Sequence, residues 1–422
     1  MSLESAVPSH IAYYISSHGY GHATRAIQLC HAFLQAHDAL RITVVSQASS
    51  HIFLPLLNSS TRVSLRPVHV DSAVVQPTPY RVDVDATVDN LLRLHAEQDD
   101  IAARESDWLQ THRVDLVLSD APYIASIAAS KARCMNILIT NFSFAEVFSY
   151  FHDMVEPPIQ SGLKEAVDAV VGGYSLADVW LRLPGSLPNP GFLSIELPSS
   201  NWIANEELRV KVGDKPEPER STTNPRFVRR IIDTPLITRP STTLSRVEVI
   251  KSLGIPTQLS NHRILLLLLP PPSPPPQIPS DWICLVAGST PTDLLPDRYF
   301  VAPSDAHIPD VMKIASCVMA KLGYGTVSEV LAADVPIVYI PRRQFIEEYG
   351  LRELVDTWRG YEGRAERMEI SDFEKGYWWW VITELADRTK TGDQDAGPTD
   401  DGDMLRRLAL DQWRVWQGSS TL

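Results

Sequence analysis

The chain has 422 residues, of which 44% are hydrophobic and 21% charged, which indicates a globular protein with two domains of roughly 200 residues each. The net charge of −13 argues against a nucleic-acid or anionic-membrane partner, no apolar run is long enough to span a membrane, and the N-terminus has no secretory signal. We therefore expect a cytoplasmic protein whose four scattered cysteines stay reduced and lack metal-ligand spacing: Cys30, Cys134, Cys284 and Cys317.

The first predicted unit is a strand, a glycine-bearing turn and a helix. Residues 11–15 form an apolar run, and residues 26–34 carry apolar side chains at helical spacing. Gly19 and Gly21 lie between them and let the chain turn tightly, which exposes the N–H groups that open the helix. Such a turn is a natural place for an anion or an oxygen-rich ligand.

Two histidines, His18 and His22, flank this turn. Imidazole titrates near neutral pH, and the carboxyl end of a parallel strand faces the crevice in which such sheets bind ligands. Either side chain is therefore placed to act as a general base. From the spacing alone, the alternative that both are solvated loop histidines helping to cap the helix stays open.

Strands and helical patterns alternate through the rest of the first half. This order indicates a parallel sheet with helices on both faces. Its carboxyl edge would collect residues 16–22, Ser119 with Asp120, and residues 141–143. The predicted strands are 41–46, 63–68, 114–120 and 136–141, with helices at 87–111 and 124–131.

A proline-rich segment marks the start of the second half. Residues 198–238 mix charge with proline, which suits an exposed connection between domains. After a predicted helix at 243–253, residues 263–269 read as a buried parallel strand. Residues 270–276 then contain six prolines, which favour an extended conformation and remove most backbone donors.

A second glycine turn lies further along the chain. Gly323 and Gly325 follow a predicted strand and precede a predicted helix, as in the first unit. One glycine turn in each half is what a two-domain enzyme with a ligand between its halves would carry. The alternative is a tight loop capped by Thr326 or Ser328. The predicted strands of this half are 282–286, one within 315–321, and 336–341.

The two glycine motifs together resemble the glycosyltransferase-like N-terminal domain of plant L-arabinokinases. The similarity covers most of residues 10–385, and the chain is more distantly similar to the bacterial N-acetylglucosaminyltransferase that completes the peptidoglycan lipid precursor. The resemblance implies a GT-B architecture, in which two Rossmann-like α/β domains with parallel sheets face each other across a nucleotide-sugar cleft. The matching segments are 19–25, 116–120, 140–143, 181–185, 323–329 and 342–348, with Arg352.

The residue pattern and the resemblance together divide the chain into four parts. Residues 1–200 would form the acceptor domain, 201–240 the interdomain connection, and 241–390 the nucleotide-sugar donor domain. Residues 391–422 would be an acidic linker and a C-terminal helix, with no sugar-kinase domain. That helix, near residues 404–416, either crosses back onto the first domain or packs on its own domain.

On the acceptor side, the resemblance implies inverting transfer of a sugar from a nucleotide-diphosphate sugar, with UDP-sugars favoured. His22 aligns with the proposed base of the peptidoglycan enzyme, and His18 is the competing candidate. Asp120 would orient the histidine or bind an acceptor hydroxyl. The other acceptor-side residues are Tyr20, Asn141, Phe142 and Ser143.

On the donor side, no metal or other cofactor is expected, because the helix opening at Thr326 offers its dipole and N–H groups to the diphosphate. Glu329 matches the family carboxylate that binds ribose hydroxyls. Glu347 and Glu348 would bind sugar hydroxyls, or else belong to a solvated helix face. The other donor-side residues are Gly21, Gly288, Gly323, Tyr324, Gly325 and Ser328, with Arg342 or Arg343 as a source of positive charge.

One departure from the family concerns the loop after the first strand of the second domain. That loop is usually rich in glycine and offers N–H groups to the donor diphosphate, whereas this chain has prolines at 270–276. Either residues 323–326 carry the phosphates alone, or donor use is altered or lost. A GT-B epimerase or hydrolase and a non-catalytic nucleotide-sugar binding protein therefore stay open, as do the acceptor and the oligomeric state.

Overall fold

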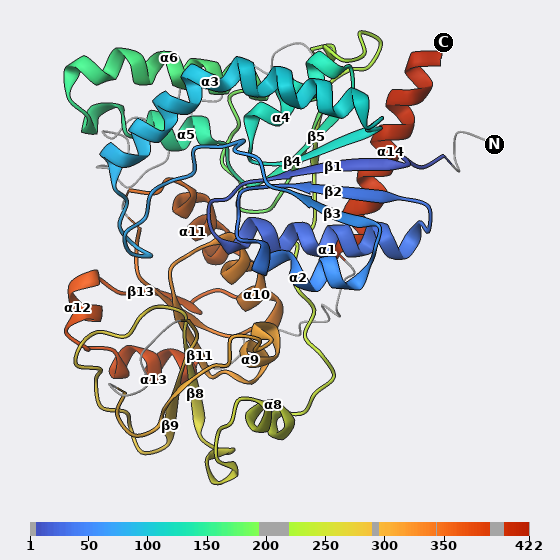
Figure 1. The fold of residues 1–422 in the computed structure, drawn as a ribbon. Coiled ribbons are helices and arrows are strands. Elements are labelled where there is room, and N and C mark those ends of the chain that lie inside the picture. The colour runs from blue at the N-terminus through green and yellow to red at the C-terminus, as the bar shows by residue number, and fades with distance from the viewer. Residues whose placement is uncertain (1–5, 194–218, 289–294, 343, 389–400, 422) are drawn as a thin grey trace.

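A computed structural model describes residues 6–193, 219–288, 295–342, 344–388 and 401–421, with only the backbone for Tyr20, Asp401, Ser420 and Thr421. The chain forms two α/β domains, one above the other in Figure 1, and each is built on a parallel sheet. No helix among the described residues is long and apolar enough to cross a membrane.

The first domain has a seven-stranded sheet in the order β3-β2-β1-β4-β5-β6-β7. Its central strand β1 is buried along its whole length and pairs in parallel with β2 and β4. The strands predicted at 41–46, 63–68, 114–120 and 136–141 are all present. The strands are β1 (His10–Ile15), β2 (Arg41–Val45), β3 (Val63–Arg66), β4 (Leu116–Asp120), β5 (Met135–Thr140), β6 (Val179–Arg182) and β7 (Arg230–Asp233).

Helices cover both faces of this sheet, as the alternating pattern predicted. Helices α1 and α2 lie on the face nearer the second domain, and α3, α4 and α6 lie on the other face (Figure 1). Helix α3 begins at Val84 because the Asp83 carboxylate accepts a hydrogen bond from the backbone N–H of Ala86 at 3.0 Å. The helices are α1 (Tyr20–Ala36), α2 (Ser50–Ser59), α3 (Val84–Thr111), α4 (Tyr123–Ala132), α5 (Phe144–Ser149) and α6 (Pro157–Tyr174).

The second domain has a six-stranded parallel sheet in the order β10-β9-β8-β11-β12-β13. Its apolar central strand β8 is almost entirely buried, as its sequence predicted. The strands are β8 (Arg263–Leu267), β9 (Trp282–Val286), β10 (Tyr299–Val301), β11 (Cys317–Ala320), β12 (Ile337–Tyr339) and β13 (Ala365–Arg367). The helices are α8 (Arg246–Ser252), α9 (Ile308–Ile314), α10 (Tyr324–Ala333), α11 (Glu347–Thr357), α12 (Ile370–Glu374) and α13 (Trp379–Asp387).

The first sheet extends into the range predicted to be a connection. Strand β7 lies within residues 201–240 and pairs with β6, so the first domain does not end near residue 200. The strand is short and largely exposed at the edge of the sheet, and its mixed charged and apolar sequence carries no clear strand pattern. The connection between the sheets therefore begins after Asp233.

The C-terminal helix α14 (Asp401–Thr421) packs on the first domain, which decides between the two predicted placements (Figure 1). The Trp413 indole N–H donates to the backbone carbonyl of Asp115 at 3.1 Å, and the Asn224 side chain donates to the carbonyl of Trp416 at 2.9 Å. Leu405 and Leu410 are buried in the core that α1 also lines. The chain thus passes twice between the two domains.

Candidate active site

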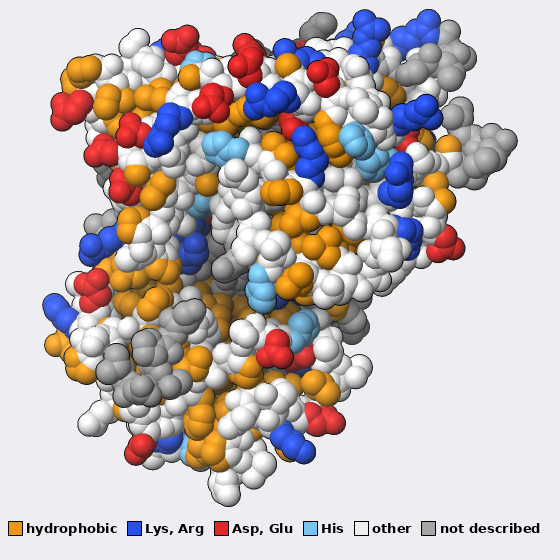
Figure 2. Space-filling model, in the orientation of Figure 1, with side chains coloured by type: hydrophobic (Ala, Val, Ile, Leu, Met, Phe, Trp, Pro, Cys, Tyr) orange, Lys and Arg blue, Asp and Glu red, His pale blue; other side chains and the backbone are white. Residues whose placement is uncertain are grey.

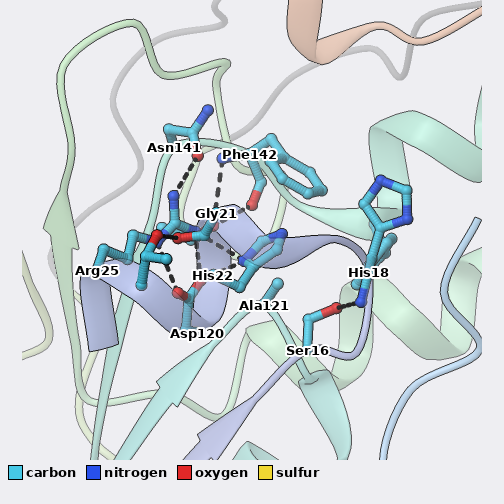
Figure 3. Close-up of polar contacts among 12 residues, drawn as sticks. Ser16, His18, Gly21, His22, Arg25, Asp120, Ala121, Asn141 and Phe142 are labelled. Atoms are coloured by element: carbon cyan, nitrogen blue, oxygen red, sulfur yellow. Dashed lines mark hydrogen bonds and ion pairs between the residues drawn. The ribbon is translucent and has the colours of Figure 1, made fainter. Parts of the chain in front are cut away.

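The first glycine turn is tighter than the sequence suggested. Helix α1 already begins at Tyr20, directly after Gly19, which adopts a φ of 75° that favours glycine. His22 therefore lies in the first turn of the helix, whereas His18 lies in the loop before it (Figure 3). The backbone N–H of His18 donates to the Ser16 hydroxyl at 3.0 Å, which fixes this loop.

His22, Asp120 and Arg25 form a buried cluster at the carboxyl edge of the first sheet (Figure 3). His22 Nδ1 lies 2.9 Å from Asp120 Oδ1, and Arg25 Nε donates to Asp120 Oδ2 at 2.6 Å. Arg25 Nη2 also contacts Asp120 Oδ1. Burial by itself raises the pKa of Asp120, but the charges and hydrogen bonds of Arg25 and His22 outweigh it and hold that pKa below its usual value.

The contact with Asp120 has a chemical consequence for the His22 ring. Two groups lie 2.9 Å from His22 Nδ1: Asp120 Oδ1, which as an ionised carboxylate only accepts, and Arg25 Nη2, which only donates. The two contacts call for opposite states of Nδ1, and the one with Asp120 is the one that puts the hydrogen on Nδ1 and leaves the lone pair on Nε2. Asp120 is also engaged by Arg25, which keeps its carboxylate in place. This arrangement suits a general base that acts through Nε2.

His18 differs from His22 in its hydrogen bonding. The backbone N–H of Val74 donates to His18 Nδ1 at 3.2 Å, so a neutral His18 ring carries its hydrogen on Nε2. The ring stacks on Phe345 of the second domain with centroids 5.1 Å apart. Burial and the nearby charges of His22, Lys321 and Arg342 lower its pKa well below the usual value. The geometry therefore favours His22 over His18 as the base.

Asp71 is a buried carboxylate at this edge that the sequence did not single out. It follows β3 and accepts a hydrogen bond from the Ser17 hydroxyl at 3.0 Å, while its Oδ2 has no hydrogen-bond partner among the described residues. Burial raises its pKa. Asp71 lies outside every motif, and its position in a loop gave no signal before the fold was known.

The three residues after β5 are brought to the same edge. Asn141 hydrogen-bonds to Arg25 and to Glu347 of the second domain, at 3.2 and 3.0 Å. Phe142 packs edge-on against the His22 ring, with centroids 5.6 Å apart. Ser143 is fully buried and caps helix α5 through Glu146, so its hydroxyl is already engaged. The side chain of Tyr20 lies outside the described residues.

The second glycine turn meets the first one. Helix α10 begins at Tyr324, directly after Gly323. A Cβ added to Gly325 would lie 3.7 Å from Gly21 Cα, so the N-termini of α1 and α10 approach each other closely. The predicted pairing of the two motifs is thus a direct contact between the two domains. Because the N-terminus of each helix carries a partial positive charge, the junction favours an anion.

Lys321 adds a full positive charge beside this junction. It is the first residue after β11, and no hydrogen bond or ion pair of its ammonium is found among the described residues. Burial and the charge of Arg342 lower the pKa of Lys321 to about 8, against the opposing effect of Glu347 and Glu348. A partly buried cation with no direct partner in the described part of the chain suits an anionic ligand. Its place directly after a strand, two residues before Gly323, is a signal that sequence reasoning could have used.

Arg342 and the two glutamates of α11 form one buried group. Arg342 Nη2 donates to Glu347 Oε2 at 3.0 Å, and the Arg342 backbone N–H donates to Glu348 Oε2 at 2.7 Å. The glutamates are therefore buried and do not belong to a solvated helix face. Burial raises the pKa of Glu348, whereas Arg342 and Asn141 outweigh burial and lower that of Glu347. Arg343 lies outside the described residues.

The remaining donor-side predictions vary in their surroundings. Glu329 pairs with Arg239 of the connection, with Nε and Oε1 2.5 Å apart, so its binding of ribose hydroxyls stays a prediction. The Ser328 hydroxyl donates to the carbonyl of Gly325, and Thr326 is partly exposed at the start of α10. Gly288 has a φ of 128° at the end of β9, with open space where a Cβ would lie.

The surface is hollowed between the two domains, and Lys, Arg and His side chains lie at its margin (Figure 2). The proline segment at 270–276 follows the carboxyl end of β8, and the Tyr299 hydroxyl donates to the carbonyl of Pro276 at 2.8 Å. Because proline has no N–H, this segment offers few backbone donors to a phosphate.

No protein-family model matches the chain. An L-arabinokinase of Arabidopsis thaliana is 29% identical over 364 residues, which cover 84% of this chain and 30% of that protein. The chain thus spans about a third of the length of this relative, which fits the predicted resemblance to one portion of an arabinokinase.

Solved structures that cover almost the whole chain share its fold. The glycosyltransferase of kitacinnamycin has a TM-score of 0.54 at 15% identity and covers 99% of this chain and 97% of its own. CalG4, the calicheamicin glycosyltransferase, has 0.53 at 15%, covering 99% and 96%. Arabidopsis thaliana UGT89C1, complexed with UDP-L-rhamnose, has 0.51 at 13%, covering 97% and 99%. The chain therefore has the predicted GT-B fold and is similar to a portion of an L-arabinokinase.

Proposed function

We propose that this protein is a glycosyltransferase that uses a nucleotide-diphosphate sugar and an acceptor deprotonated by His22. The observation that carries the proposal is the meeting of two complementary groups at the domain junction. The first domain contributes His22, whose Nδ1 lies 2.9 Å from Asp120 Oδ1, and the proposal takes the hydrogen to be on Nδ1 so that Nε2 acts as the base. The second domain contributes a helix N-terminus and the Lys321 ammonium.

On the acceptor side, His22 Nε2 takes the proton of the attacking hydroxyl or amine. The acceptor atom bonds to the anomeric carbon while the bond to the diphosphate oxygen breaks, which inverts the configuration. The imidazolium that forms is stabilised by the Asp120 carboxylate. A base positioned in this way contributes about 10²–10⁴-fold to the rate.

On the donor side, the leaving diphosphate gains negative charge as the sugar departs. Lys321 and the N-terminus of α10 supply positive charge there, which stabilises the leaving group in a partly buried site. This scheme needs no metal ion and no N–H groups from the proline segment. We infer a UDP-sugar as the donor, in keeping with the UDP-L-rhamnose in the complex of the Arabidopsis neighbour.

A specific observation favours one other candidate, a protein that binds a nucleotide sugar without turning it over. The proline segment removes backbone donors after β8, and Arg239 already occupies the predicted ribose-binding carboxylate of Glu329. Such a protein would bind the donor and leave it unchanged. A GT-B epimerase or hydrolase would instead consume the donor without an acceptor.

A thermal-shift screen with UDP, GDP, ADP, dTDP and their common sugars tests the donor site. A ligand at about 100 times its Kd adds roughly 2.7 kcal/mol of stability, enough to raise the Tm by several degrees. We expect a shift with UDP that is lost in Lys321→Ala and kept in Lys251→Ala, which removes an exposed lysine of α8. If no nucleotide shifts the Tm of the folded protein, the donor assignment is wrong.

Product analysis then separates the candidate activities. The shifted UDP-sugar is incubated with and without candidate acceptors, and the sugar products are identified by mass spectrometry. Transfer requires the second substrate, whereas epimerisation or hydrolysis proceeds with the donor alone. Binding without any consumption would support the non-catalytic candidate.

A further inference from the structure

A line of buried hydrogen bonds joins the His22 cluster to the second domain. Arg25, which donates a hydrogen bond to Asp120, also donates through Nη1 to Asn141 Oδ1 at 3.2 Å. Asn141 Nδ2 in turn donates to Glu347 Oε1 at 3.0 Å across the domain junction. Arg342 donates to the other oxygen of Glu347, also at 3.0 Å.

The chemistry of the neighbours fixes how Asn141 is oriented. Arginine can only donate hydrogen bonds, and an ionised glutamate can only accept them. The residue between Arg25 and Glu347 must therefore accept on one side and donate on the other, as an asparagine amide does. An aspartate at this position would keep the contact with Arg25 but would face Glu347 with a like charge.

The residues of this hydrogen-bonded line are buried, and Arg25 makes a second contact with the other domain. Asn141 is fully buried, and Arg25 and Glu347 are 5% and 7% exposed. The Arg25 guanidinium also lies over the Tyr324 ring of α10, 5.0 Å from its centroid. Arg25 thus contacts the base cluster and the first residue of the proposed phosphate-binding helix at once.

We propose that Arg25 and Asn141 are positioning residues that hold the two domains together at Glu347 and thereby align His22 and Asp120 against the donor site. The alignment of His22 then depends on the contact of α11 with the first domain. Asn141 is the one residue of this link that both accepts and donates a hydrogen bond. The catalytic part of this inference rests on the proposed function, whereas the domain link itself does not.

The domain link is tested without any ligand by double electron–electron resonance. The native cysteines are buried, so spin labels attach at Glu97→Cys on α3 and Lys251→Cys on α8, both exposed. We expect one narrow distance in the parent and a longer, broader distribution in Asn141→Asp. Asn141→Leu, which neither accepts nor donates, is the second variant in case the aspartate impairs folding.

A matched control breaks a different contact between the domains. The backbone N–H of Val82 donates to Gln344 Oε1 at 3.4 Å, outside the Arg25 line, so Gln344→Ala should keep the parent distance. The proposal is overturned if both Asn141 variants give the parent distribution. It is also overturned if Gln344→Ala opens the domains as far as they do, because the link would then have no special role.

Turnover of UDP-glucose, with an acceptor found by the product analysis, tests the catalytic part in the same variants. We expect kcat to fall at least 10-fold in Asn141→Asp and Asn141→Leu while KM changes less than 3-fold, with Gln344→Ala near the parent. An unchanged kcat in variants with separated domains would overturn the alignment role. If the parent consumes no UDP-glucose, the proposed donor is at fault, and the resonance distances still decide the domain link.

Discussion

Replacing Asp120 by asparagine tests the base cluster most directly. Asp120 is fully buried, and its partner Arg25 has a side chain that is 4% exposed. Removing one partner of a buried ion pair leaves an uncompensated charge and costs about 3–5 kcal/mol. That is a large share of the roughly 5–15 kcal/mol by which proteins are stable, so Asp120→Asn should lower the free energy of unfolding clearly.

The same substitution should also reduce turnover. The new side-chain amide can present its NH₂ group to His22 Nδ1, which places the imidazole hydrogen on Nε2 and removes the proposed base. We expect the rate to fall about 10²–10⁴-fold, the usual contribution of a positioned base. Lost turnover with unchanged stability would mean that Arg25 finds another counter-ion.

Urea unfolding followed by tryptophan fluorescence measures the effect on stability. The matched control is Asp233→Asn, because Asp233 is held by Arg182 in the same two-bond geometry, at 2.6 and 2.9 Å, but its side chain is 73% exposed. An exposed pair contributes about 0–1 kcal/mol. A loss in Asp120→Asn no larger than in the control would refute the reasoning.

The pH dependence gives a second check with a definite sign. The pKa of Asp120 is lower in the folded protein than in the unfolded chain, where it is about 3.9. The pair therefore stabilises the folded state fully above that value, and its contribution is lost as the pH falls through the folded pKa. The difference in unfolding free energy between the parent and Asp120→Asn should therefore shrink as the pH falls into the acid range below about 4.

Three further predictions follow from single side chains. His22→Ala should abolish turnover but leave UDP binding, measured by calorimetry, nearly unchanged; weaker binding would make His22 a ligand contact. UDP affinity should fall as the pH rises from 7 to 9, because the pKa of Lys321 is about 8 and only its protonated form attracts phosphate; Lys321→Arg should remove this dependence. Burial raises the pKa of Glu146 to about 8, whereas the same group in the unfolded chain has a pKa of about 4.3. Between about pH 4.3 and pH 8, the two pKa values, the folded protein keeps a proton that the unfolded chain has released, so the free energy of unfolding falls as the pH rises. Glu146→Gln should be more stable than the parent at pH 8 and lack this slope in urea unfolding.

The fold was predictable because its signals are local. Apolar runs such as 263–269 separated by helical patterns predict a parallel sheet, and two glycine turns in a fixed order predict two related domains. Strand β7 was missed because it is an exposed edge strand whose sequence resembles a charged loop. Its place depends on pairing with β6, which the sequence of β7 does not encode by itself.

The site was predictable only where a motif marked it. His22 comes soon after one predicted strand and Asp120 ends another, and the two strands are neighbours, so their proximity follows from the sheet. The choice of His22 over His18 depends on the backbone N–H of Val74, far along the chain, which no spacing rule reveals. The role of Arg25 was equally hidden, because it depends on Asn141 and on the approach of the second domain.

The proline segment and Lys321 leave the same edge of the second sheet and would both shape the proposed donor site. Strands β8 and β11 are neighbours in the sheet, so the segment that follows β8 and the lysine that follows β11 leave the same edge, with the two strands about 4.8 Å apart. Backbone N–H groups, which the prolines lack, would bind phosphate at any pH. A lysine with a pKa of about 8 binds phosphate only when protonated. In the proposed site, the ammonium charge of Lys321, which titrates near neutral pH, therefore takes the place of the constant partial charges of backbone N–H groups. Donor binding in this protein should therefore depend on pH where a glycine-rich loop would not.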